Sequence, residues 1–282
     1  MKTFYVQIIL TIALLPFTAK GQDHDKDATG HYKLVWADEF NKDGAPDSAN
    51  WKFERGFVRN HEAQWYQPQN AVCKNGLLTI EVRKEHLPNP NYIAGSNDWR
   101  TNREFIAYTS SSMNTSGRHS WRYGRFVMRA RIETDPGLWP AFWTLGVSKP
   151  WPSNGEIDIM EYYRNMLLAN IACGTAKPNN AKWYSNRKQL NSLGTGWSRH
   201  FHIWRMDWDE NSISLYVDDQ LLNRVELKDL VNQDGSGFNP FKQPHYILLN
   251  LALGGDNGGE PGATKFPRRF EVDYVRVYQK ML

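Results

Sequence analysis

Residues 155–161 read Gly-Glu-Ile-Asp-Ile-Met-Glu, which places three carboxylates in a run that is otherwise apolar and partly β-branched. Acidic side chains are costly in such a run unless they share a polar face, where they also shift one another's pKa values. Side chains alternate faces along a regular strand, so Glu156 and Asp158 would point one way and Glu161 the other. A β-bulge at Ile159-Met160 would return Glu161 to the face of the other two acids. Two Glu with an Asp between them, lining one groove, is an arrangement that glycoside hydrolysis uses.

Short alternating or β-branched runs recur along the rest of the chain and are separated by turn clusters such as Asp135-Pro136-Gly137. They span residues 33–36, 77–83, 124–132, 157–160, 167–172, 213–217, 246–251 and 272–278. Long helical periodicity is hard to find. The pattern predicts an all-β sandwich that forms a single domain over residues 32–282.

The N-terminus has the features of an export signal. Residues 1–21 combine Lys2, a mostly apolar stretch over 4–17 and a small-x-small site at Ala19-Lys20-Gly21, which together predict a signal peptide. The apolar stretch is shorter than the about 20 residues of a transmembrane helix. Residues 22–31 are polar and predict a short leader. We expect an exported protein, either periplasmic or secreted, with no membrane span.

The composition restricts the classes of partner that the protein is expected to bind. The net charge of +4 is mild and the basic residues are scattered, so no basic stripe for nucleic-acid binding is present. The chain has 12 Trp, 13 Tyr and 13 Phe, of which most are expected in the core and several as stacking surfaces for sugar rings. Cys73 and Cys173 lie in strand-like runs, which leaves open both a disulfide bridge and two buried thiols.

Two long polar stretches interrupt the strand pattern. Residues 86–104 and 176–199 contain Trp99, Trp183 and Trp197 among polar and basic side chains. Long irregular loops are frequently functional, so these stretches are expected either to wall a substrate groove or to be surface insertions.

The acid run, preceded by Gly-Leu-Trp-Pro-Ala-Phe-Trp at 137–143, resembles glycoside hydrolase family 16 in its laminarinase-like branch. Further segments follow in family order and span nearly the whole chain after the leader. They are Trp-Ala-Asp-Glu-Phe at 36–40, Glu-Ala-Gln-Trp-Tyr at 62–66, Asn-Gly-Leu-Leu-Thr-Ile at 75–80, Tyr-Gly-Arg-Phe at 123–126, Phe-His-Ile-Trp at 201–204, Tyr-Val-Asp at 216–218, Leu-Asn-Leu-Ala-Leu-Gly-Gly at 249–255 and Val-Asp-Tyr-Val-Arg-Val-Tyr at 272–278.

The resemblance implies a concanavalin-A-like β-jelly-roll sandwich of two curved antiparallel sheets, with the active site on the concave face. It also implies endo-acting hydrolysis of a β-linked polysaccharide with retention of configuration, without a catalytic cofactor. Glu156 would be the nucleophile, Asp158 its helper and Glu161 the acid/base. Retention needs two carboxyl groups about 5–5.5 Å apart. We expect burial and the charge of Glu156 to raise the pKa of Glu161.

Substrate-binding and metal residues follow from the same resemblance. The residues expected to contact substrate are Trp139, Trp143, Trp151, Glu62, Arg125, His202 and Asn250. Among these, Trp139 is the best candidate for the groove, Trp143 is the tryptophan best suited to core packing, and His202 is equally suited to a structural role. Many family members carry a structural calcium on the convex side, for which Glu39, the Gly76 carbonyl and Asp273 match. An ion pair between Asp273 and an arginine such as Arg276 is the alternative.

The sequence departs from the laminarinase pattern after the acid run. Typical laminarinases carry a Thr-x-His element there, whereas residues 168–176 contain no His and residues 177–187 contain Lys177, Lys182, Trp183 and Arg187. Such groups suit hydroxyl-rich, branched or anionic sugars. The open substrates are therefore a β-1,3(-1,4)-glucan and a galactose-containing glycan, the latter cleaved by an endo-β-galactosidase on mucin-type O-glycans or poly-lactosamine. A transglycosylase and a non-catalytic carbohydrate-binding protein are further alternatives, and a monomer is expected.

Overall fold

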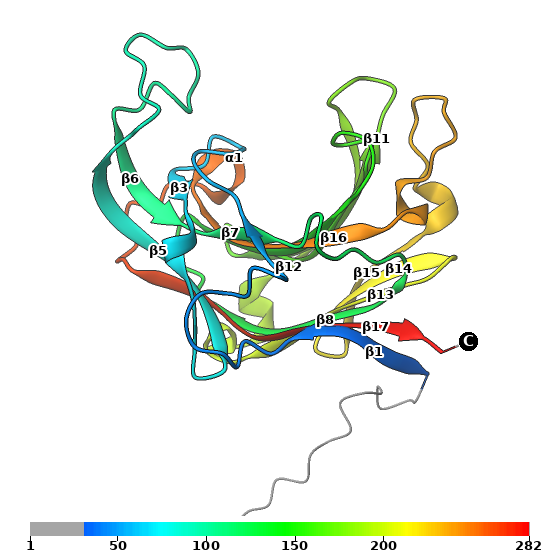
Figure 1. The fold of residues 1–282 in the computed structure, drawn as a ribbon. Helices are drawn as coiled ribbons and strands as arrows, with labels where there is room; N and C mark the ends of the chain where they lie inside the picture. The colour runs from blue at the N-terminus through cyan, green and yellow to red at the C-terminus, as the bar shows by residue number, and fades with distance from the viewer. Residues whose placement is uncertain (1–30, 282) are drawn as a thin grey trace, which may run out of the picture.

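Two curved β-sheets lie one above the other in the computed structural model, which describes residues 31–281 (Figure 1). The predicted signal peptide, 1–21, and the predicted leader up to residue 30 lie outside the described residues. All eight predicted strand runs fall within strands, which confirms the all-β prediction.

The upper sheet in Figure 1 has seven antiparallel strands and carries the site described below. In spatial order these are β12 (Ala181–Gln189), β11 (Met166–Gly174), β10 (Glu156–Tyr163), β9 (Leu138–Gly146), β16 (His245–Leu253), β7 (Ser112–Asn114) and β2 (Lys52–Phe53). Residues 181–189 were expected within a loop, and that expectation is wrong because they form the edge strand β12.

The second sheet has ten strands and covers the convex side of the first. Its main path is β15 (Gln220–Glu226), β14 (Ser212–Val217), β13 (His202–Trp208), β8 (Gly124–Ile132), β17 (Arg268–Lys280), β5 (Leu77–Pro88), β6 (Phe105–Ser110) and β3 (Gln64–Tyr66), with β1 (Tyr32–Asp38) beside β17 and β4 (Ala71–Lys74) beside β5. The β3–β6 pair is parallel, and the other pairs are antiparallel.

Helical structure is confined to short connections in the described part of the chain. It comprises α1 (Gly255–Gly258) and 3₁₀ turns at Pro68–Asn70, Leu190–Leu193, Trp197–Arg199, Leu227–Asp229 and Pro240–Lys242. Within residues 31–281, no helix has the length and apolar character needed to cross a membrane.

The core lies between the sheets and follows the period-2 alternation of the strands. In β8, Phe126 and Met128 are fully buried in the core, whereas Arg125 and Arg129, which flank them, face outward. These outward arginines pair with Asp207 and other acids on neighbouring strands. Opposite charges side by side on a sheet stabilise its solvent face modestly. The polar face of β8 is therefore the outer surface of the sandwich.

The bulge predicted in the acid strand is confirmed. The pairing of β10 with both neighbours shifts register between Asp158 and Glu161. Ile159 and Met160 consequently both enter the core, while Asp158 and Glu161 face the opposite side. The register shift at the bulge thus keeps all three acids on the concave face although two residues separate Asp158 from Glu161.

The two cysteines are buried free thiols, one in β4 and one in β11. Burial raises the pKa of the Cys73 thiol to about 12. The disulfide alternative is therefore not realised in this structure.

The predicted metal side chains are engaged elsewhere. Both oxygens of Glu39 accept hydrogen bonds from Arg276, and Asp273 pairs with Arg129, while Gly76 lies in the turn between β4 and β5. No cluster of three or more His, Cys, Asp or Glu side chains suited to a metal occurs among residues 31–281. The carboxylates do not fit a calcium ion as they are placed, because arginines already neutralise them. The predicted Asp273–arginine pair does form, with a different arginine.

Candidate active site

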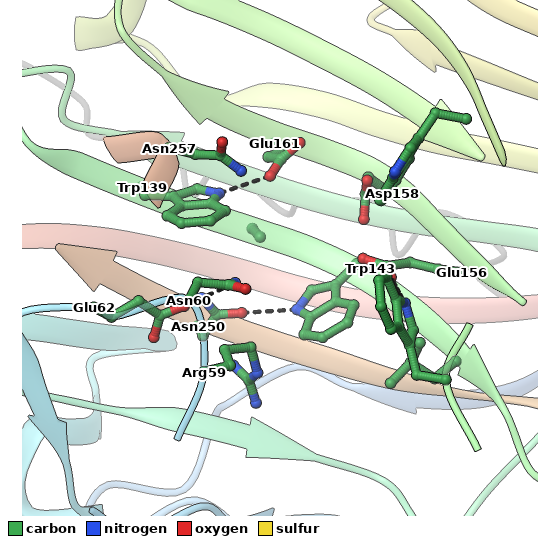
Figure 2. A pocket seen from close by; sticks show the side chains of 14 residues that line it. Arg59, Asn60, Glu62, Trp139, Trp143, Glu156, Asp158, Glu161, Asn250 and Asn257 are labelled. Carbon is green, nitrogen blue, oxygen red and sulfur yellow. Dashed lines mark hydrogen bonds between the residues drawn. The ribbon is translucent and has the colours of Figure 1, made fainter. Parts of the chain in front are cut away.

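A cleft of about 410 Å³ opens on the concave face of the seven-stranded sheet. Its size is that of a typical small-ligand site. Figure 2 shows the three acids of β10 on one side of it and Asn250 of β16 with Arg59 on the other. The side chains that line the cleft are Arg59, Asn60, Glu62, Trp139, Ala141, Trp143, Leu145, Trp151, Glu156, Asp158, Glu161, Trp183, Asn250 and Asn257.

The acids are held by a small set of buried donors. Asn170 of β11 donates its amide hydrogens to Asp158 at 3.2 Å and to Glu161 at 2.8 Å. Asn170 is directly opposite Asp158 in the sheet, so the backbone pairing fixes this bridge. Asp158 also hydrogen-bonds with Glu156, which links all three acids into one network.

Glu161 has the electrostatic environment of a proton donor. Burial, together with the charge of Glu156, raises the pKa of Glu161 to about 7, while hydrogen bonds from Trp139 and Asn170 oppose the rise. A general acid works best when its pKa lies near the working pH. Glu161 therefore holds a proton near neutral pH and can accept one back when its surroundings change.

Burial raises the pKa of both Glu156 and Asp158, but different neighbouring groups act on each of them. Burial raises the pKa of Glu156, and the indole of Trp151, the Asp158 carboxyl and the Arg59 guanidinium counteract it. Burial and the two neighbouring glutamates raise the pKa of Asp158 well above its ordinary value. Of the two, Glu156 is thus the carboxyl whose anion is stabilised, and Asp158 is the one that keeps a proton to donate.

The tryptophans predicted for substrate contact all border the cleft. Trp139 and Trp143 lie four residues apart on the concave face of β9 and are only 6% and 8% exposed. The Trp139 indole donates to Glu161 at 2.7 Å, and the Trp143 indole donates to Asn250 at 2.7 Å (Figure 2). Trp151 is 42% exposed and donates to Glu156. Each indole therefore both presents a ring edge or face to the cleft and orients a polar group.

Glu62 lies on the opposite wall of the cleft and is almost fully buried. The Gln64 amide donates to it at 2.7 Å and the Asn60 amide at 3.3 Å, and burial raises its pKa. These amides and a hydrogen bond from Tyr66 hold Glu62 in place without making it part of the acid network of β10.

The prediction that Arg125 and His202 contact the substrate is wrong, because both lie outside the cleft. Arg125 faces outward on β8 in the ten-stranded sheet and forms a bidentate pair with Asp207. His202 stacks on Trp197 with ring centroids 3.7 Å apart and hydrogen-bonds Asp218, again on the ten-stranded sheet. Neither side chain lines the cleft, because both lie on the outer face of the ten-stranded sheet, where they are largely covered by their partners.

Arg59 lines the cleft although it was not predicted to, and Trp183 lines it from a stretch that was expected either to wall a groove or to be a surface insertion. Arg59 is held by Glu54, and its guanidinium carbon lies 5.3 Å from the centre of the Trp143 ring. Trp183 of β12 is 45% exposed and reaches the cleft two strands away from the acids. The available signal for Arg59 was its place three residues before the Glu62 motif, and for Trp183 its place in an unusually aromatic and basic stretch.

The geometry agrees with what the comparisons with known proteins find. A family model described as glycosyl hydrolases family 16 matches residues 58–276, a range that includes the acid strand and most of both sheets. The chain belongs to this family. It is a glycoside hydrolase, which acts on O-glycosyl bonds.

Relatives within family 16 cover nearly the whole chain. A β-glucanase from Rhodothermus marinus is 33% identical over 98% of this chain and 93% of its own length. The laminarinase catalytic domain from Thermotoga maritima superposes with a TM-score of 0.74 at 31% identity, covering 89% of this chain and all of that domain. A structure from work on endo-acting O-glycanases, with which prominent human gut bacteria initiate mucin breakdown, superposes with a TM-score of 0.80 at 34% identity, covering 90% of this chain and 93% of that one.

Proposed function

We propose that this protein is a retaining endo-β-glycosidase that hydrolyses internal linkages of a β-1,3(-1,4)-glucan by double displacement. The observation that carries the proposal is the pair of glutamates, Glu156 and Glu161, on one face of a bulged strand within the cleft. The similarity to a β-glucanase and a laminarinase over nearly the whole chain supports the glucan as substrate.

In the first step, a carboxylate oxygen of Glu156 attacks the anomeric carbon while the glycosidic C–O bond breaks. Glu161 gives its proton to the departing oxygen, which leaves as the hydroxyl of the shortened chain. The proton that Asp158 keeps can be directed to the second oxygen of Glu156, which orients the attacking oxygen.

In the second step, water replaces the departed chain. Glu156 is now an uncharged ester, so the pKa of Glu161 falls below its resting value because the negative charge that raised it is gone. Ionised Glu161 takes a proton from water, the hydroxyl oxygen attacks the anomeric carbon, and Glu156 leaves as a carboxylate. Two inversions at the anomeric carbon give net retention.

A galactose-containing glycan is the second candidate substrate. The O-glycanase structure gives the higher TM-score, 0.80 against 0.74 for the laminarinase domain. In addition, β11 presents Asn170 rather than a histidine to the acids. Both observations support mucin-type or lactosamine chains as the alternative to the glucan.

The deciding experiment is product analysis by mass spectrometry after incubation with laminarin, lichenan, agarose, carrageenan, poly-N-acetyllactosamine and mucin O-glycans. We expect oligosaccharides from the glucans, and none from any sample with Glu156→Gln. Galactose-ended fragments from the last two samples would establish the second candidate instead. Cleavage of no sample, together with unchanged binding by Glu156→Gln, would establish a binding protein. Products longer than the starting oligosaccharide would identify transglycosylation.

We also propose that the protein is exported, in line with the signal-like sequence of residues 1–21, and acts as a monomer. Expression of the full chain in a bacterial host should yield a mature protein that begins at Gln22 outside the cytoplasm. A retained N-terminus would contradict export, and a dimer mass in size-exclusion chromatography with light scattering would contradict the monomer.

A further inference from the structure

The edge strand β12 extends the polar face of the acid strand toward the rim of the cleft. The pairing of β10 with β11 and of β11 with β12 places residues in straight rows across three strands. One row joins Glu156 to Trp183 through β11, and another joins Glu161 to Arg187 through Leu168. Directly opposite residues of adjacent strands share a face. Because Trp183 lines the cleft, Arg187, four residues further along the same strand, is on the cleft face as well.

Arg187 differs from the arginines of the convex sheet in lacking an acidic partner. Arg125, Arg129 and Arg276 are each paired with a carboxylate. The side chain of Arg187, by contrast, is exposed and makes no ion pair or hydrogen bond within the described residues. Its charge nevertheless reaches the acid cluster, since it lowers the pKa of Glu161. A solvated guanidinium beside a carboxylate-rich cleft is a group available to a ligand.

We propose that Arg187, on the same face of β12 as Trp183 and four residues beyond it, forms a subsite for an anionic substituent, a sulfate ester or a carboxylate, on the glycan chain. The proposal rests on the endo-β-glycosidase function proposed above and names a substrate class for it. The guanidinium presents paired N–H donors that match two oxygens of either group. Two strand spacings, about 10 Å, separate Arg187 from the acid strand, so the substituent lies on a sugar away from the scissile bond.

The charge distribution of the cleft makes this subsite selective. The floor carries Glu156, Asp158 and Glu161, which disfavour an anionic group near the bond that breaks. The opposite charge at the rim favours such a group there, and the exposed Trp183 ring, further along β12, offers a stacking surface for another sugar of the same chain. The subsite would therefore accept a charge at one distance from the cleavage point and reject it at another.

The test compares Arg187→Gln with the matched control Lys188→Gln. Lys188 is the next residue of β12, is on the opposite face and donates to Gln220 at 2.6 Å. The substrates are neutral and charged forms of the same chain: laminarin against sulfated and carboxymethylated laminarin, and poly-N-acetyllactosamine against its sulfated and sialylated forms. The measured quantity is the ratio of kcat/KM for the charged form to that for the neutral form.

We expect Arg187→Gln to lower this ratio about tenfold or more, as charge-assisted hydrogen bonds do, and Lys188→Gln to leave it unchanged. The sulfated and carboxylated arms then identify the group. An equal loss on both forms, no change in Arg187→Gln, or the same change in Lys188→Gln would overturn the proposal. If the wild type cleaves none of these chains, calorimetric binding of the same pairs to Glu156→Gln, with and without Arg187→Gln, tests the subsite separately from catalysis.

Discussion

Replacing Trp139 with Phe should move the basic limb of the pH–activity profile upward. The Trp139 indole donates to Glu161 at 2.7 Å inside a buried site, and this bond favours the ionised carboxylate. Phenylalanine keeps an aromatic ring but has no donor, so the pKa of Glu161 rises and the proton is held to higher pH. Hydrogen bonds to charged groups contribute about 1.5–3 kcal/mol, and 1.36 kcal/mol corresponds to one pKa unit, so the limb should move by about one to two pH units.

The matched control is Trp143→Phe. Trp143 is on the same strand and the same face, with almost the same exposure, but its indole donates to Asn250 rather than to an acid. The assay is kcat/KM as a function of pH on an oligosaccharide that the wild type cleaves, with circular dichroism to verify folding. The reasoning is refuted if the basic limb of Trp139→Phe stays in place or moves down, or if Trp143→Phe moves it equally.

Three further predictions concern Asp158, the turn before Glu156 and the convex face. Asp158 keeps a proton near neutral pH, so Asp158→Asn should retain kcat within about tenfold. Asp158→Ala should lower kcat by about 10²–10³, the usual cost of losing a preorganised donor, and equal losses in the two variants would contradict this reasoning. Gly155 has a φ of +78°, and a Cβ added there would lie 2.8 Å from the Pro240 side chain. Gly155→Ala should therefore reduce the free energy of unfolding, measured in urea, by about 1–3 kcal/mol. Gly262→Ala is the control, because its Cβ would enter open space, and it should leave this free energy unchanged. Since Asp273 is already paired with an arginine, EDTA should leave the melting temperature unchanged, and a clear drop would indicate a bound metal.

The sequence was most informative where neighbouring residues constrain one another. The spacing of Glu156, Asp158 and Glu161 requires either a split of the acids between faces or a bulge, and burial of the two apolar residues between them decides for the bulge. The strand runs were equally predictable, because alternation between core and surface is a local property.

The sequence could not predict whether the polar face of a strand points into the cleft or outward from the sandwich. Arg125 and His202 are in strands that alternate as regularly as the acid strand does, yet their polar sides face outward from the sandwich. Nothing in their own strands distinguishes a concave face from a convex one. Arg59 was missed because it approaches the cleft through a loop. Trp183 was expected in a loop rather than a strand because the second face of β12 meets the neighbouring sheet mainly through Tyr184, Asn186 and Lys188, which removes the apolar alternation.

The bulge in β10 also bears on which changes in strand length such a site tolerates. A chain one residue shorter between Asp158 and Glu161 could pair without a register shift, and its hydrogen-bond ladder would be more regular than the one observed. Its second glutamate would then stand two residues after Asp158 and would still face the concave side by simple alternation, with one apolar residue instead of two entering the core between these acids. Regular and bulged acid strands can therefore present the same three carboxylates, and a single-codon insertion or deletion converts one into the other, a route that a search limited to substituted positions would overlook.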